Sequence, residues 1–135
     1  MILSYKKKYL WGKQTNFKEK ILEGTKVHTF REDPHGRWLA GRHIHHAHGV
    51  RTKYYDCFLE NDCVSVQSVQ IHHYESEPPM QRIEIIIDGE VVLSPHCELM
   101  EKIAKNDGFG SVDDFFKWFN TDFHGKIIHW TNLKY

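Results

Sequence analysis

The sequence predicts an α+β fold: a small β-barrel of about six strands, with a short N-terminal helix and two helices before the last strand. Three observations lead to this expectation. Segments rich in β-branched and aromatic residues fill most of the chain, Asp88-Gly89 is a strong hairpin signal, and helix signals occur only near the start and near the end. The 135 residues are enough for one core, so we expect a single domain over residues 1–135.

The first half of the chain alternates strands with one short helix. Residues 2–11 alternate imperfectly with a period of two, which favours a strand. A helix is expected from Phe17, with its end at Gly24, since glycine readily takes the left-handed conformation that ends helices. Strand-like segments follow at residues 26–31 and 42–49.

The middle of the chain reads as further strands. We expect strands at residues 54–58 and 63–74 around a turn at 59–62, and a shift of phase between Val66 and Val69 indicates a bulge. A Pro-containing loop follows at 76–80.

The last third of the chain combines a hairpin, two helices and a closing strand. Residues 82–87 and 91–93 flank the Asp88-Gly89 turn. Ser94-Pro95 is typical of a helix start, and Ser111 is expected to cap a second, aromatic helix. Residues 126–135 are predicted to form the last strand.

Charge is distributed unevenly although the net charge is zero. Residues 1–56 hold 12 Lys and Arg against 5 Asp and Glu, while residues 57–135 hold 6 against 13. This asymmetry is typical of a basic surface that meets phosphate. The alternative is that the two halves neutralise each other in the fold.

Composition also bears on the compartment. No apolar run approaches the length of a membrane span, and the N-terminus lacks the apolar core of a signal peptide. Three cysteines cannot form a fully paired disulfide framework. We therefore expect a cytoplasmic protein with reduced thiols and no membrane partner.

Four short motifs appear in order along the chain. Residues 24–31 read Gly-Thr-Lys-Val-His-Thr-Phe-Arg, a Gly-x-Lys-x-x-Thr-x-Arg pattern. Trp38-x-x-Gly41 precedes a strand, Asp107-Gly108-Phe109 precedes a helix, and a strand from Lys126 closes the chain. In this order they resemble the signature of ASCH domains, members of the PUA-like superfamily, over residues 17–135. The resemblance implies the barrel with helices described above.

The resemblance also implies a function, because PUA-like folds commonly bind RNA or a modified base. The leading hypothesis is a module that binds RNA or a nucleoside in a cleft next to residues 24–31. Aromatic side chains stack on unpaired bases and cations contact phosphates. The candidate ligand-binding residues are Arg31, Trp38, Arg51, Lys53 and Tyr54.

A second hypothesis is an amidohydrolase. Some small bacterial ASCH proteins hydrolyse N4-acetylcytidine with a Lys, a Thr and an acid, and the motif match places these at Lys26, Thr29 and Asp107. Thr29 would be the nucleophile, Lys26 the general base and Asp107 the acid. The family acid is typically Glu, so Asp107 is one methylene shorter. Residues 26 and 29 of a regular strand face opposite sides, so a shared site needs a turn or bulge between them.

The histidines give a third, weaker hypothesis, a ribonuclease that uses the run His43–His48. A strand would place His43 and His45 on one face and His46 and His48 on the other, so either pair could chelate a metal. The sequence shows no third and fourth ligand at a recognisable spacing. We therefore predict neither a metal nor another cofactor.

Overall fold

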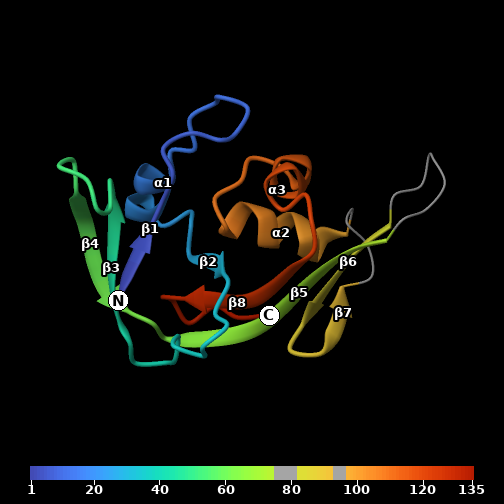
Figure 1. Ribbon diagram of the computed structural model, residues 1–135. Helices are drawn as coiled ribbons and strands as arrows, with labels where there is room; N and C mark the ends of the chain where they lie inside the picture. Colours follow the sequence, from blue (N-terminus) through green and yellow to red (C-terminus); the bar gives the residue numbers. More distant parts are fainter. Residues whose placement is uncertain (75–81, 93–96) are drawn as a thin grey trace.

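The computed structural model of the protein describes residues 1–74, 82–92 and 97–135, which form an α+β fold of eight strands and three helices (Figure 1). The strands are β1 (Ile2–Ser4), β2 (His28–Arg31), β3 (His43–His48), β4 (Asp56–Asp62), β5 (Ser65–Tyr74), β6 (Arg82–Ile87), β7 (Glu90–Val92) and β8 (Phe123–His129). The helices are α1 (Phe17–Glu23), α2 (Glu98–Asn106) and α3 (Val112–Trp118). The short N-terminal helix and the two helices before the last strand are as predicted.

The described strands lie in two open sheets and not in the closed barrel that we expected. One sheet has the order β1-β3-β4 and the other β2-β8-β5-β6-β7. Only Cys63 and Val64 separate β4 from β5, so the chain passes directly from the first sheet into the second. Two backbone hydrogen bonds fasten this corner, from Cys63 N to Arg42 O and from Val64 N to His129 O, both 2.8 Å.

The predictions for the middle strands need correction. Residues 59–62, predicted to be a turn, belong to β4 and pair with β3. The bulge predicted between Val66 and Val69 is absent from the described register of β5, which pairs continuously with β8. The phase shift arises because Gln67 takes the inward position and is buried with a hydrogen bond to His129. A register shift occurs instead in β3, between His46 and Ala47.

The strand predicted at 2–11 ends at Ser4, and the last strand, predicted at 126–135, is Phe123–His129. Three turn and cap signals match the structure. Gly24 ends α1 with φ 84°, and Asp88 and Gly89 form the turn between β6 and β7 with φ of 49° and 82°. Ser111 Oγ accepts a hydrogen bond from Asp114 N at 3.1 Å and caps α3. The loop predicted at 76–80 and the helix start predicted at Ser94-Pro95 lie outside the described residues, and α2 is described from Glu98.

The helices cover one side of the sheets. Figure 1 shows α2 and α3 over the five-stranded sheet and α1 beside β1. Met100 and Ile103 of α2 belong to the same buried core cluster as Ile127 and Ile128 of β8. Among the described residues, no helix combines the length and the apolar character needed to cross a membrane.

Candidate functional site

A pocket of about 180 Å³ lies where the N-terminal segment, α1, β2 and the connection from α2 to α3 meet. Its polar lining includes Lys26, Thr29, Arg31 and Asp107. Its aromatic lining consists of Tyr5, Phe17, Phe30, Phe109, Trp118 and Phe119. These four polar residues are all candidates from the sequence. They surround one cavity, although Asp107 is far from the other three in the chain.

Lys26 and Thr29 share this pocket because Lys26 lies outside the strand. The chain leaves α1 through Gly24, and the Lys26 backbone N–H still donates to Lys20 O at 3.0 Å. Strand β2 begins only at His28, so the alternation of strand side chains does not apply to residue 26. Thr29 and Arg31 are two residues apart on β2 and thus on the same face.

Lys26 is buried, with 2% of its side chain exposed. Its Nζ donates to the backbone carbonyl of Asp107, lies 3.2 Å from Asp107 Oδ1, and stands 4.7 Å from the centre of the Phe17 ring. Burial lowers the pKa of Lys26 from 10.5 to about 8, although the nearby Asp107 carboxylate acts in the opposite direction. A substantial fraction of Lys26 is therefore neutral near pH 8.

Asp107 is held by a chain of hydrogen bonds behind the pocket. His28 Nδ1 lies 3.2 Å from Asp107 Oδ1, and His28 Nε2 lies 2.6 Å from the Tyr135 hydroxyl. Asn106 Nδ2 donates to that hydroxyl at 3.1 Å. Burial lowers the pKa of His28, which favours neutral imidazole with Nδ1–H donating to Asp107 and Nε2 accepting from Tyr135.

Arg31 is the second cation of the pocket. Its terminal nitrogen donates to Ser4 O at 2.6 Å, and its guanidinium carbon lies 5.2 Å from the centre of the Tyr5 ring. The buried Nε of Arg31 has no hydrogen-bond partner among the described residues. An unsatisfied buried donor is costly, so this atom is a natural position for an acceptor from a ligand.

The other predicted ligand-binding residues do not line this pocket. Trp38 is 6% exposed, and its backbone N–H donates to Asp33 at 3.0 Å. Arg51, Lys53 and Tyr54 lie in the connection between β3 and β4, and Tyr54 is 71% exposed. Lys53 Nζ stands 5.1 Å from the centre of the Tyr54 ring. The structure thus separates these four residues from Lys26 and Asp107.

The histidine run divides between the two faces of β3, as the strand pattern predicts. His43 and His45 are solvent-accessible, while His46 and His48 are buried. His46 Nδ1 lies 2.8 Å from the hydroxyl of Tyr5, and His46 Nε2 lies 2.7 Å from Asn61 Oδ1. His46 thus supports Tyr5 in the pocket wall.

Sequence reasoning missed three residues around the pocket: Tyr5, His28 and Tyr135. His28 stands inside the motif at 24–31, where the pattern allows any residue. Tyr135 is 107 residues away from its partner His28, so no local signal connects them. Burial is continuous over His28, Thr29 and Phe30 of β2, so no alternation of buried positions marks His28 either.

Comparisons with protein-family models, with curated proteins and with solved structures found no match to this chain.

Proposed function

We propose that the pocket binds the base of a modified nucleoside, as the resemblance to ASCH domains of the PUA-like superfamily implies. The observation that carries this proposal is the placement of two cationic side chains, the buried Lys26 and the largely buried Arg31, beside the aromatic side chains that form half of the pocket lining. Aromatic walls take up a planar ring, and a few fixed polar groups read its edge. The free Nε–H of Arg31 would donate to a carbonyl or ring nitrogen of the base.

The size of the pocket favours a single base over a strand of RNA. Its volume of about 180 Å³ is below the roughly 300–1,000 Å³ typical of sites for drug-sized ligands. A nucleic-acid strand also needs cations along its backbone. Arg51 and Lys53, the candidates for that role, are not part of the pocket lining.

A second candidate function is hydrolysis of an N4-acyl amide on cytidine, and the lowered pKa of Lys26 favours it. Neutral Lys26 would take the proton of the Thr29 hydroxyl as its oxygen attacks the acyl carbon. The carbon–nitrogen bond then breaks, and the Lys26 ammonium returns the proton to the departing amine. Water hydrolyses the acyl-threonine, so one amide and one water give cytidine and a carboxylic acid. Asp107 would hold the Lys26 amine in place.

The test is incubation of the purified protein with N4-acetylcytidine, with cytidine release followed by chromatography and binding followed by calorimetry. Thr29→Val removes the hydroxyl and keeps the side-chain volume, so we expect at least about a 10³-fold loss of turnover with binding retained. Thr25→Val is the matched control, because Thr25 is exposed and bonds only locally to Lys20 O. It should leave turnover unchanged.

Each outcome separates the two functions. Binding of N4-acetylcytidine and of cytidine without turnover would support the nucleoside-binding function alone. Turnover that survives in Thr29→Val would exclude Thr29 as the nucleophile. Absence of both binding and turnover for these nucleosides would contradict the proposal.

A further inference from the structure

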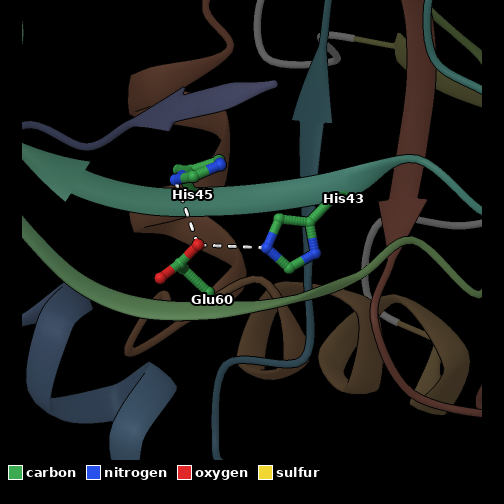
Figure 2. Close-up of side chains that lie close together, drawn as sticks. All are labelled: His43, His45 and Glu60. Atoms are coloured by element: carbon green, nitrogen blue, oxygen red, sulfur yellow. Dashed lines mark hydrogen bonds and ion pairs between the residues drawn. The ribbon is translucent and has the colours of Figure 1, made fainter.

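The outer face of the β3–β4 pair carries a second cluster of titratable side chains, away from the pocket. The antiparallel register sets His43 opposite Asp62 and His45 opposite Glu60. Two imidazoles on one strand thus face two carboxylates on the next. Figure 2 shows both rings and the Glu60 carboxylate converging from the two strands. Glu60 comes from the segment 59–62, predicted to be a turn, and it is a third candidate ligand that no spacing in the sequence indicates.

The distances in this cluster suit a small metal ion. Glu60 Oε1 lies 3.1 Å from His43 Nε2 and 3.4 Å from His45 Nδ1. One ligand atom from each of the three residues lies within 4.8 Å of the others. In a tetrahedral zinc site with bonds of about 2.0–2.2 Å, ligand atoms stand about 3.3 Å apart. Two of the three separations already match this value.

Asp62 completes the arrangement from outside the three ligands. Its Oδ1 lies 2.8 Å from His43 Nδ1. A carboxylate that accepts the proton of one ring nitrogen fixes the tautomer and points the other nitrogen at the metal. Here that other nitrogen is Nε2, the atom that faces Glu60.

We propose that His43, His45 and Glu60 bind one divalent first-row transition ion of the Zn²⁺ class, with Asp62 orienting His43. Two imidazoles and one carboxylate suit zinc, nickel or copper, whereas magnesium and calcium prefer all-oxygen sites. The side chains are accessible, with 51% of His43, 39% of His45 and 54% of Glu60 exposed. Water can therefore reach the remaining coordination position.

This site is independent of the proposed nucleoside pocket. None of its ligands lines the pocket, and β3 is the central strand of its sheet. His45 pairs with Ile2 of β1 on one side and with Glu60 of β4 on the other, and His43 pairs with Asp62 of β4. On the inward side of β3, His46 has partners in Tyr5 and Asn61, and His48 Nδ1 bonds to the backbone carbonyl of Tyr5. Failure of one proposal therefore leaves the other standing.

The experiment is a Zn²⁺ titration of the full chain after removal of metals with EDTA, in competition with a chromophoric chelator. We expect one high-affinity site per chain. His45→Asn and Glu60→Gln each remove a ligand and should weaken binding by at least about 100-fold. Asp62→Asn keeps all three ligands and should weaken it by about 10–100-fold, the range for outer-shell partners.

His124→Asn is the matched control, because His124 is an exposed histidine on β8 outside the cluster. This substitution should change the Zn²⁺ affinity by less than about twofold, because a histidine outside the site does not bind the metal. Thermal unfolding without metal checks that every variant folds. A stoichiometric site that persists unchanged in His45→Asn and Glu60→Gln would overturn the proposal, as would the absence of any site in the native chain. Loss of the site on replacing the free Cys57, Cys63 and Cys97 with Ser, and not on replacing His45, would also overturn it.

Discussion

The pocket and the outer face of β3–β4 each place one carboxylate oxygen between two basic side chains. In the pocket, Asp107 Oδ1 lies 3.2 Å from both Lys26 Nζ and His28 Nδ1. On the outer face, Glu60 Oε1 lies 3.1 Å from His43 and 3.4 Å from His45. The arrangements differ in burial, since the three pocket side chains are at most 3% exposed.

This difference decides what each cluster can do. In a buried cluster the surroundings fix protonation, because a charge without a partner is costly where water is excluded. The low pKa of Lys26 is the result, and it makes neutral amine available near pH 8. In an exposed cluster, water stabilises each member separately, so the same geometry contributes little to folding and remains free to exchange protons for a metal ion.

The largest expected effect that separates the two regions is on stability. Asp107→Ala should lower the free energy of unfolding by about 3–5 kcal/mol, because it leaves buried Lys26 without its counter-ion. Glu60→Ala, the equivalent change in the exposed cluster, should stay within about 0.5 kcal/mol in metal-free buffer. Urea denaturation of both variants measures the difference.

Equal effects in these two variants would break the comparison. In particular, a small loss for Asp107→Ala would mean that Lys26 is neutral in the folded protein well below pH 8. Lys26 and Asp107 would then not form an ion pair at neutral pH.

A smaller effect on stability is expected from replacing one glycine next to each region by alanine. Gly108 and Gly41 have nearly the same φ, 91° and 90°, so alanine meets the same backbone strain of about 1 kcal/mol at either position. A Cβ on Gly108 would lie 2.9 Å from Lys26 Cδ and 3.0 Å from Phe17 Cδ1, whereas a Cβ on Gly41 has no atom within 4 Å.

Gly108→Ala should therefore cost about 1–3 kcal/mol more than Gly41→Ala, the usual range for overpacking. Thermal or urea unfolding of the two variants gives this difference directly. A difference near zero would show that Lys26 and Phe17 can move aside, and that the pocket is less tightly packed than its contacts indicate.

Local sequence signals predict much of this fold, because they act over a few residues. Gly24, Asp88-Gly89 and Ser111 end or begin elements as expected, and the alternation along β3 separates His43 and His45 from His46. Closure of a barrel could not be predicted in this way, since it depends on which strands pair. The error at residues 59–62 has the same origin: polar residues typical of turns lie instead on the exposed edge strand β4.

The two sites also depend on contacts between distant segments, which local sequence signals do not specify. Lys26, Thr29 and Arg31 are close in sequence, but Asp107 joins them across 81 residues. In the sequence, the order of the motifs links Asp107 to these three residues, and a periodic pattern does not. Glu60 joins His45 through the register of β3 and β4, which no local pattern specifies. The roles of all these residues in binding and catalysis stay predictions that the experiments above address.

The most selective prediction concerns the pH dependence of stability. The folded-state pKa of Lys26 is about 8 and its unfolded value is 10.5, so between these values the unfolded chain binds more protons. Stability from this residue therefore increases as pH rises through that window. Between pH 7 and pH 9.5 the gain amounts to about 1–2 kcal/mol, at about 1.4 kcal/mol per pH unit above the folded pKa.

Lys26→Met keeps the side-chain length and removes the titrating group, so the native protein should gain this amount relative to the variant over the same range. Urea denaturation of both proteins at pH 7 and pH 9.5 measures it, and the subtraction cancels the tyrosines and cysteines that also titrate. Lys18→Met is the control, because Lys18 forms an ion pair with Asp56 in which both side chains are partly exposed. The free energy of unfolding of Lys18→Met should change with pH as that of the native protein does. If Lys26→Met also follows the native protein, burial has not shifted the Lys26 pKa, and the amine cannot serve as a base near neutral pH.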